Sequence, residues 1–242
     1  MVLPGLWQVG GMSKTTDPGS LARKLATGAF RPKKPQQDRS RASLERLLAA
    51  TRKLMLESGN DEFTLLDVSK QARTSTGTIY QRFESKENLV RAVIFSMLEE
   101  TGEALASTIR SVDDMSSTLP SFLDNLVEGY AHFLESNAPL LRLCMDRAEV
   151  DSDVSQLGKE NFRSSEAAAT RAIISLGHAT GIAISQDMAS TCYHIVYASL
   201  TRQFSIGASK EAGDADVLDL LKRELSAVCL AYLMAGPRTE KS

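Results

Sequence analysis

Residues 75–83 read Ser75-Thr76-Gly77-Thr78-Ile79-Tyr80-Gln81-Arg82-Phe83, and this stretch decides the fold. A serine is a preferred helix N-cap, and Ile79 and Phe83, four residues apart, give the short helix that follows one apolar face. Its other positions carry hydroxyl and amide groups, and no carboxylate appears before Glu84. Gly77 costs about 1 kcal/mol inside a helix relative to alanine. We therefore expect this helix to bring its backbone close to another surface and to present hydrogen-bond donors there.

Two more helices are predicted before this stretch. An amphipathic helix begins at Arg39 and can end at Gly59-Asn60, because its inward residues recur at i, i+3 and i+4; they are Leu44, Leu47, Leu48, Thr51 and Leu54. Thr64-Leu65-Leu66-Asp67 then predicts a capping box, in which the threonine hydroxyl and the acid three residues later satisfy the helix start reciprocally. The short helix that it opens continues through Ala72.

A longer helix is predicted after the stretch, with Ser85 as its N-cap and Arg110 near its end. Its inner face carries Leu89, Val93 and Met97. Three short helices with a tight turn between the second and third form the minimal helix-turn-helix, whose third helix enters the major groove of DNA. The donors on residues 75–83 suit that role, because base edges are read there by hydrogen bonds.

The rest of the chain is also predicted to be helical. Apolar periodicity places helices near 118–136, 139–147, 153–177, 186–206 and 215–235. Gly177, Gly207 and Gly236-Pro237 are the expected helix stops. No convincing two-residue alternation bounded by turns appears, so strands are not expected. The predicted class is all-α, with about nine helices in two domains.

Charge is unevenly distributed along the 242 residues, although the net charge is only −2. Residues 1–91 hold 16 Lys+Arg against 9 Asp+Glu, whereas the remainder holds 12 against 21. A basic first third joined to an acidic remainder favours one part that faces nucleic acid and one that avoids phosphates. Residues 1–38 are expected to form a flexible basic extension. Its basic arm, residues 14–41, has two open interpretations: extra DNA contacts or a solvated tail.

Composition and motifs argue against other classes of protein. No apolar run approaches the roughly 18 residues of a membrane span, and no signal peptide is apparent. Three cysteines, Cys144, Cys192 and Cys229, form no disulfide or zinc pattern, so a cytoplasmic location is expected. No histidine stands at metal-ligand spacing with another ligand, and no phosphate loop or nucleophile elbow is present. We therefore expect neither an enzyme nor a bound cofactor or metal.

Residues 39–91 resemble the DNA-binding domain of the TetR family. That family favours a threonine that opens the second helix, a Ser-x-Gly-x-hydrophobic-Tyr recognition helix and a following Phe-x-Ser-Lys-x-x-Leu. This chain matches at the family spacing with Thr64, Ala72, Ser75, Gly77, Tyr80, Phe83, Ser85, Lys86 and Leu89. Two positions depart from the pattern: Arg73-Thr74 replaces the usual Gly-Val of the turn, and Ser69 replaces a common alanine. Arg73 is then expected to take a left-handed backbone angle without being glycine.

The resemblance implies a role for each matching residue. Thr64, Tyr80 and Lys86 would contact phosphates, and the free N–H groups of the helix that begins at Lys86 also favour anions. Within the helix-turn-helix, residues 64–83, the groove would be faced by Ser75, Thr76, Gly77, Thr78 and Gln81. For Tyr80 and Lys86 the alternative is a packing tyrosine and a solvated lysine, and the surrounding motif favours DNA contact.

The resemblance also implies that residues 92–242 form a domain for dimerisation and ligand binding. Its last two helices would pair with those of a second copy, through an apolar stripe of Val217, Leu221, Leu225, Val228 and Tyr232 with Leu218 and Cys229 beside it; the alternative is intramolecular core. A small molecule would bind among the middle helices, at Tyr130, Phe133, Cys144, Met145, Tyr193 and Tyr197, with Phe122, Leu141 and Phe204 as further candidates. Arg142 or Arg147 could meet an acidic group of that molecule.

The predicted function is a homodimeric repressor that binds a palindromic DNA operator and is released by a small-molecule ligand. The alternative is a constitutive DNA-binding or DNA-organising protein of the same fold that has no inducer.

Overall fold

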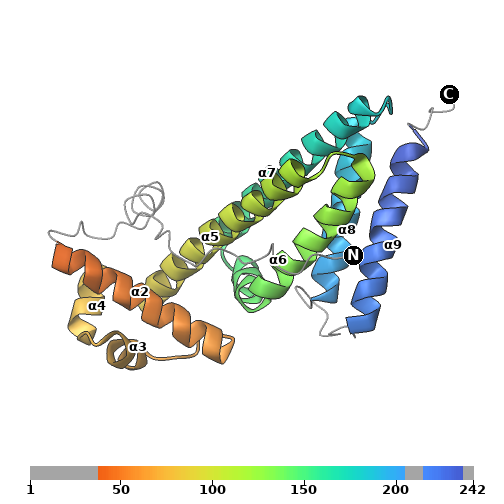
Figure 1. The fold of residues 1–242 in the computed structure, drawn as a ribbon. Helices are drawn as coiled ribbons and strands as arrows, with labels where there is room; N and C mark the ends of the chain where they lie inside the picture. Colours follow the sequence, from red (N-terminus) through yellow and green to blue (C-terminus); the bar gives the residue numbers. More distant parts are fainter. Residues whose placement is uncertain (1–37, 205–214, 237–242) are drawn as a thin grey trace. The chain divides into compact units, whose positions relative to one another are not determined.

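The computed structural model describes residues 38–204 and 215–236, and this part of the chain contains eight helices and no strand (Figure 1). The helices are α2 (Asp38–Ser58), α3 (Leu65–Ala72), α4 (Thr76–Arg82), α5 (Lys86–Met115), α6 (Leu119–Ala148), α7 (Ser152–Ala179), α8 (Gln186–Gln203) and α9 (Ala215–Met234). The predicted all-α class is confirmed. The predicted extension and the stops at Gly207 and Pro237 lie outside the described residues.

These helices belong to two compact units. The first unit takes Asp38–Thr51 and Thr64–Ala92 of the described chain, so it holds most of α2 together with α3, α4 and the start of α5. The second unit takes Arg52–Phe63 and the described residues from Val93 onward. Helices α2 and α5 therefore contribute residues to both units.

The core of the first unit follows the apolar periodicity of the sequence. Leu47 and Ala50 of α2 are buried, as are Val68 of α3 and Leu89 of α5. Thr51 is buried because its hydroxyl donates to the Leu47 carbonyl oxygen at 2.9 Å, which satisfies that polar group inside the core. The inward faces predicted for α2 and α5 are therefore observed.

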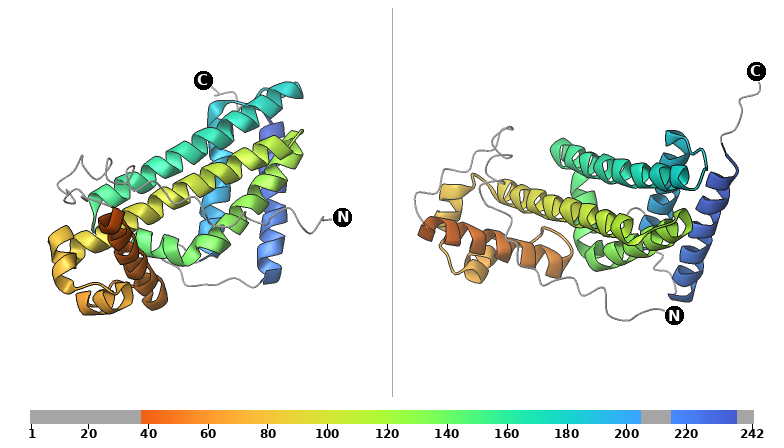
Figure 2. Two further views of the ribbon diagram at one scale, coloured as in Figure 1. Left: turned by 60° about the vertical axis from the view of Figure 1, so that its left-hand side comes forward. Right: turned by 45° about the horizontal axis from the view of Figure 1, so that its top comes forward.

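The second unit packs α6, α7, α8 and α9 around one apolar core, and α5 runs beside α7 in the views of Figures 1 and 2. Large buried side chains at its centre include Phe122 and Leu126 of α6, Ile173 of α7 and Val196 of α8. Leu225, Cys229 and Leu233 close the core from α9. No helix among the described residues combines the length and apolarity that a membrane span needs.

Helix α6 corrects one sequence prediction. Two helices were expected near 118–136 and 139–147, whereas one helix runs through both and contains Pro139. A proline inside a helix costs about 3 kcal/mol, because it removes an N–H donor and crowds the preceding turn. The buried face nevertheless continues across it, through Leu134, Ala138, Leu140, Leu143 and Cys144. Burial of a large aliphatic side chain is worth about 1.5–3 kcal/mol, so packing on both sides outweighs the local penalty.

The helix ends follow the glycines with one exception. Gly59, with φ 71°, follows α2, and Gly236, with φ 74°, follows α9, so these two predicted stops are confirmed. Gly177 does not end α7, which continues to Ala179 before Gly181 turns the chain with φ 76°. Gly177 is required for packing instead, because a Cβ there would lie 2.4 Å from Cδ1 of Ile184.

Candidate nucleic-acid interface and ligand cavity

Helix α4 is positioned by its cap and by two apolar anchors. The Ser75 hydroxyl accepts from the Thr78 backbone N–H at 3.1 Å, which satisfies one free donor of the helix start. Ile79 and Phe83 are 0% and 2% exposed, so one face of α4 is fixed in the core of the first unit. The opposite side, with Thr76, Gly77, Tyr80 and Gln81, is left to face outward.

The turn before α4 adopts the strained geometry expected from its sequence. Arg73 lies in the left-handed region with φ 50° and ψ 48°, so that prediction is confirmed. The Thr74 N–H donates to the Ser69 carbonyl at 3.0 Å, and the Ser69 hydroxyl donates to the Thr74 carbonyl at 2.5 Å. Ser69 and Thr74 thus close the turn with a reciprocal pair of hydrogen bonds. The serine that departs from the family pattern compensates for the missing glycine, which the sequence did not reveal.

The start of α3 forms the predicted capping box. Asp67 N–H donates to the Thr64 hydroxyl at 3.2 Å, and the Asp67 carboxylate accepts from the Thr64 N–H at 2.9 Å and from its hydroxyl at 2.6 Å. The Thr64 hydroxyl, with its backbone N–H, lowers the pKa of Asp67. Both donors of Thr64 are therefore already engaged, so a phosphate would have to compete with Asp67 for them.

The expected groove residues fall into two groups. The hydroxyls of Ser75 and Thr78 are 2.9 Å apart and bonded to each other, so this pair retains one proton for another acceptor. Thr76, Tyr80 and Gln81 make no side-chain hydrogen bond within the described residues, and Tyr80 is 59% exposed. These three side chains are available to an incoming partner.

Gly77 and Lys86 complete the exposed surface around α4. A Cβ on Gly77 would meet only the Ser75 hydroxyl, at an ordinary 3.7 Å, so nothing in the described chain requires glycine there. Lys86 is partly buried at the first residue of α5, whose start is capped by the Ser85 hydroxyl, which accepts from the Asn88 N–H at 3.1 Å. All eight predicted DNA-contact residues therefore belong to the first unit and lie on α4 or at a helix N-terminus.

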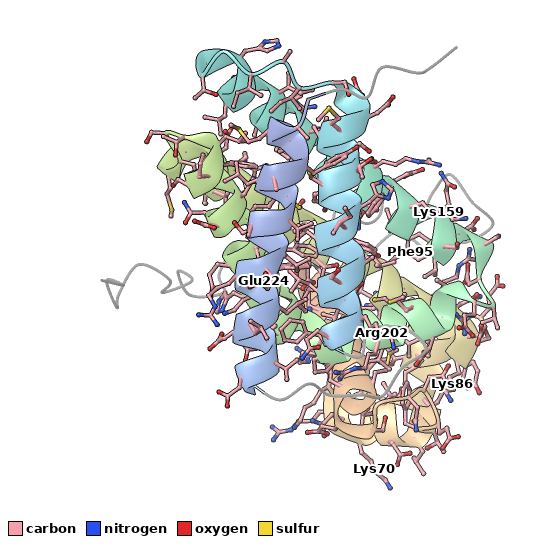
Figure 3. All side chains as sticks on the ribbon, turned by 90° about the vertical axis from the view of Figure 1, so that its right-hand side faces the viewer. Lys70, Lys86, Phe95, Lys159, Arg202 and Glu224 are labelled. Atoms are coloured by element: carbon pink, nitrogen blue, oxygen red, sulfur yellow. The ribbon has the colours of Figure 1, made fainter. Side chains whose placement is uncertain are left out.

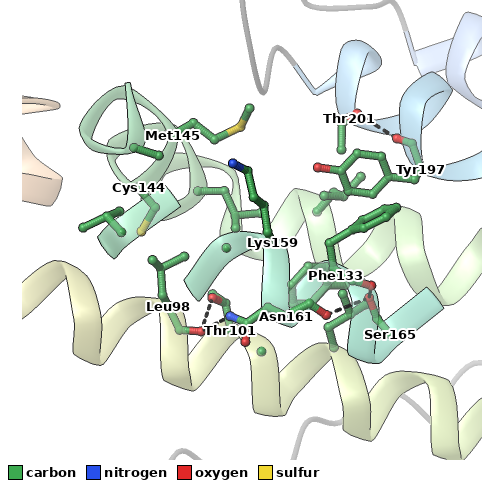
Figure 4. Close-up of a pocket in the computed structure, with 18 of the residues that line it drawn as sticks. Leu98, Thr101, Phe133, Cys144, Met145, Lys159, Asn161, Ser165, Tyr197 and Thr201 are labelled. Carbon is green, nitrogen blue, oxygen red and sulfur yellow. Dashed lines mark hydrogen bonds between the residues drawn. The ribbon is translucent and has the colours of Figure 1, made fainter. Parts of the chain in front are cut away.

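A cavity of about 400 Å³ lies among α5, α6, α7 and α8, entirely within the second unit (Figure 4). We call it the α5–α8 cavity. Its walls are mainly apolar and aromatic: Leu98, Thr101, Gly102, Leu105, Tyr130, Phe133, Leu134, Leu141, Cys144, Met145, Ala148, Val154, Ser155, Gly158, Lys159, Asn161, Phe162, Ser165, Tyr197 and Thr201. Its size and composition are those of a small-molecule site.

Most residues predicted to contact a ligand line this cavity. They are Tyr130, Phe133, Leu141, Cys144, Met145 and Tyr197. Tyr193 lies behind the wall, where its hydroxyl donates to the Ser165 hydroxyl at 2.7 Å. Phe122 is part of the closed core, and Phe204 ends α8, where its carbonyl accepts from Arg142 at 2.9 Å. Burial raises the pKa of Tyr130 and raises that of the Cys144 thiol to about 12, so both groups remain protonated at neutral pH.

The cavity also contains residues that the sequence did not reveal, chiefly on α7. Lys159 contributes a cation, whereas the two arginines considered for that role are engaged elsewhere: Arg142 with Phe204, and Arg147 with Asp61 at 3.9 Å and Asp151 at 3.7 Å. The charged and polar residues of α7 follow an ordinary amphipathic pattern. Lys159 is itself exposed, so its position at the edge of the cavity, and not burial, distinguishes it from other surface lysines.

The apolar stripe predicted on α9 divides between two faces. Leu225 and Cys229 are buried, and Leu218, Leu221 and Tyr232 pack against the same core, so these residues are intramolecular. The opposite side, which we call the outer face of α9, carries the exposed side chains of Val217, Leu220, Val228 and Met234, each at least half exposed. Helices α8 and α9 lie side by side at the front of Figure 3, with Glu224 labelled on α9.

The chain is similar to known regulatory proteins. Residues 47–93 match the family described as bacterial regulatory proteins, tetR family. A stretch of 107 residues is 26% identical to the HTH-type transcriptional regulator YvdT of Bacillus subtilis and covers 44% of this chain but only 53% of that relative. The chain thus spans about half the length of the curated relative that it matches.

Solved structures extend the likeness to the whole fold. A TetR-family transcriptional regulator from Mesorhizobium loti has a TM-score of 0.62 at 17% identity and covers 82% of this chain and 98% of its own. A tetR-family regulatory protein from Rhodococcus has a TM-score of 0.56 at 17% identity, with 81% and 98% covered. At this identity, the two structures establish the arrangement of helices and nothing about ligands.

Proposed function

This chain belongs to the TetR family of bacterial regulatory proteins, and we propose that it is a homodimeric repressor that a small-molecule ligand releases from its DNA operator. Residues 39–91 form the DNA-binding domain of this proposal, and residues 92–242 form the domain for dimerisation and ligand binding. We also propose a cytoplasmic location, because a bacterial DNA operator lies in the cytoplasm.

The observation that carries the proposal is the outward side of α4. Thr76, Tyr80 and Gln81 present donors that no other described residue uses, while Gly77 leaves the backbone uncovered between them. Free donors on a short helix suit base edges and phosphates in the major groove, and an exposed glycine lets the helix approach closely. Lys86 and the start of α5 add a cation and the positive end of a helix dipole for a phosphate.

The outer face of α9, together with α8, supports the proposed dimer. Exposed apolar side chains at Val217, Leu220, Val228 and Met234 recur along one side of the helix, as expected of a surface that a second copy covers. A two-fold dimer places two recognition helices in successive major grooves, so we expect an inverted repeat with half-sites about one helical turn apart.

Release by a ligand needs a physical link from the α5–α8 cavity to the helices that carry the DNA-binding residues. Arg52, near the end of α2, donates to Glu100 of α5 at 2.5 Å, and Glu100 lies beside the cavity-lining Leu98 and Thr101 in sequence. Arg147 of α6 contacts Asp61, which lies in the connection from α2 to α3. Both ion pairs lie within the second unit and involve the segment that leads into the helix-turn-helix. A ligand that favours one arrangement of these helices would shift the DNA-binding equilibrium.

The test uses DNA selected by the protein from a random pool. Lys86→Ala should weaken binding to all sequences about equally and lower the salt slope of log affinity by about one unit, because one phosphate contact is lost. Thr76→Ala should instead change the preferred base at one position of each half-site and leave the salt slope nearly unchanged.

Lys70→Ala provides a matched control, since Lys70 is an exposed lysine of the same unit outside the proposed contact set. A Lys86→Ala protein that changes its preferred sequence would show that Lys86 reads bases rather than a phosphate. If the selection enriches no DNA sequence, the DNA-binding proposal is overturned.

A further inference from the structure

The wall of the α5–α8 cavity carries one kind of charge. Among the residues that line it, Lys159 is the only ionisable cation, and no aspartate or glutamate is present. Lys159 makes no ion pair or hydrogen bond within the part of the chain that the structure describes. Figure 4 shows its side chain reaching from α7 into the space bounded by Met145 and Tyr197. Lys159 is exposed, so its ammonium keeps contact with water at the edge of the apolar wall and can form a charge-assisted hydrogen bond with a bound anion.

Most other polar groups of the wall are already satisfied inside the protein. Thr101 donates to the Met97 carbonyl at 3.0 Å, Thr201 donates to the Tyr197 carbonyl at 2.7 Å, and Asn161 donates to the Leu98 carbonyl at 2.8 Å. These side chains shape the cavity, but they have few donors left for a ligand.

Two tyrosine hydroxyls differ from these groups, because they have no hydrogen-bond partner in the described part of the chain. The hydroxyls of Tyr130 and Tyr197 make no hydrogen bond among the described residues, although Tyr130 is only 3% exposed. Both hydroxyls belong to residues that line the cavity, and that of Tyr130 is not sealed off from it, so a ligand group that accepts a hydrogen bond can meet them there. Tyr130 and Tyr197 are near each other, with ring centroids 6.1 Å apart. The cavity therefore offers unused donors from α6, α7 and α8 and no unpaired carboxylate.

We infer that the ligand of the α5–α8 cavity is an amphipathic anion, an apolar body that carries one acidic group. The acidic group pairs with the Lys159 ammonium and accepts from Tyr130 or Tyr197. The apolar body packs against Leu98, Phe133 and Met145. This inference rests on the proposed function, because it names the class of molecule that would release the protein from DNA. It also sets a selectivity rule: an anion binds more tightly than a neutral molecule of the same shape.

Two fluorescent probes with the same ring skeleton test this rule. They are 8-anilinonaphthalene-1-sulfonate, an anion, and N-phenyl-1-naphthylamine, which lacks the sulfonate and is neutral. The full chain is titrated with each probe, and dissociation constants are compared between the wild type and Lys159→Met. The wild type should prefer the anion. Lys159→Met should weaken the anion about threefold to fivefold, because the lysine is exposed, and change the neutral probe less than twofold. Lys159→Glu should weaken the anion further.

Two control variants locate the binding. Lys53→Met makes the same change at an exposed lysine of α2 that pairs with Glu57 outside the cavity, and it should leave both probes unaffected. Gly158→Leu adds a side chain where a Cβ would meet nothing within 4 Å, so it should occupy the cavity and weaken both probes at least tenfold without strain. Circular dichroism verifies that each variant keeps its helices. Probe binding that Gly158→Leu does not change would overturn the assignment to this cavity.

The outcomes separate this inference from the proposed function. Equal affinity of the wild type for the two probes, or an equal effect of Lys159→Met on both, overturns the inference. Anion binding that depends on Lys159 but leaves the protein on its selected DNA supports the inference and counts against ligand release.

Discussion

Gly77 lies in the middle of α4 with its surroundings open on the protein side. A Cβ there would have one neighbour, the Ser75 hydroxyl at 3.7 Å, and the backbone is not in the left-handed region that favours glycine. Neither packing nor conformation within the described chain therefore accounts for a residue that weakens the helix. The proposed close approach to DNA would account for it, because a methyl group between α4 and the groove floor would separate the two surfaces.

Gly77→Ala should accordingly separate stability from DNA binding. The free energy of unfolding should rise by up to about 1 kcal/mol, because alanine is the better helix former. Affinity for the selected DNA should fall at least tenfold. Urea denaturation and fluorescence anisotropy measure the two effects. Gly158→Ala, at another open helical glycine in the second unit, should raise stability and leave DNA affinity unchanged. Full DNA affinity in Gly77→Ala would contradict the close approach.

At the scale of single elements, α3 depends on its capping box. Thr64 and Asp67 exchange three hydrogen bonds at the helix start, and the carboxylate lies where the helix dipole favours negative charge. The pKa of Asp67 is lowered chiefly by the side-chain hydrogen bond from Thr64. Its folded pKa therefore lies below the ordinary aspartate value of about 3.9. The stabilisation is present above that value and is lost as the pH falls through the folded pKa.

Asp67→Asn should lower the melting temperature at pH 7, and the difference from the wild type should shrink as the pH is lowered below about 4. Thr64→Ala should remove most of the same pH dependence, because it removes the largest cause of the lowered pKa. Melting curves followed by circular dichroism between pH 7 and pH 3 measure both effects. A difference that stays constant across this range would show that the carboxylate charge does not stabilise α3.

Helix α9 has two apolar faces with different roles. Leu225 and Leu233 are buried in the core of the second unit, whereas Val228 is 53% exposed on the outer face. Both kinds of position look alike in the sequence, since apolar residues occupy more than half of the helix circumference. The structure separates the buried face from the exposed face proposed as the interface, and it places Leu221 and Leu225 against the core, so charged substitutions there would disrupt the monomer rather than test the dimer.

Val228→Glu should convert the protein from a two-chain to a one-chain species in sedimentation velocity while its helical content is unchanged. DNA affinity should fall strongly, since both half-sites must be held together. Val150→Glu is the matched control, because Val150 is 79% exposed and far from α9 in sequence. Leu225→Ala should instead lower the free energy of unfolding by about 2–5 kcal/mol. A Val228→Glu protein that remains dimeric would exclude the outer face of α9 as the interface.

At the scale of the whole molecule, two helices connect the proposed functions. Helices α2 and α5 each begin in the first unit and end in the second, and Arg52 and Glu100 join them by an ion pair. Both side chains are about one third exposed, so the ion pair is partly shielded from solvent. We expect its contribution to appear in the ligand response rather than in the fold.

Glu100→Gln should bind the selected DNA within about threefold of the wild type. A bound anion should release this variant from DNA less effectively than it releases the wild type. Coupling between two sites is typically worth only about 1–3 kcal/mol, so the loss of one contact can reduce it noticeably. The ratio of DNA affinities with and without the anion measures this coupling. Glu103→Gln, at an exposed glutamate of the same helix, should leave the ratio unchanged. If Glu100→Gln leaves the ratio of DNA affinities unchanged, this ion pair does not couple the cavity to DNA binding.

The sequence by itself determined the helices, their caps and the helix-turn-helix, because these depend on contacts within a few residues. The Thr64 capping box, the Ser75 cap and the left-handed Arg73 all follow from neighbours in the chain. Only the tertiary structure decided that α6 runs through Pro139, which face of α9 is buried, and that Lys159 rather than Arg142 lines the cavity. Each of these outcomes depends on which apolar surface packs against which, and side chains that are far apart in the sequence decide it. Helical periodicity identifies an apolar face, but it does not identify the surface that covers that face.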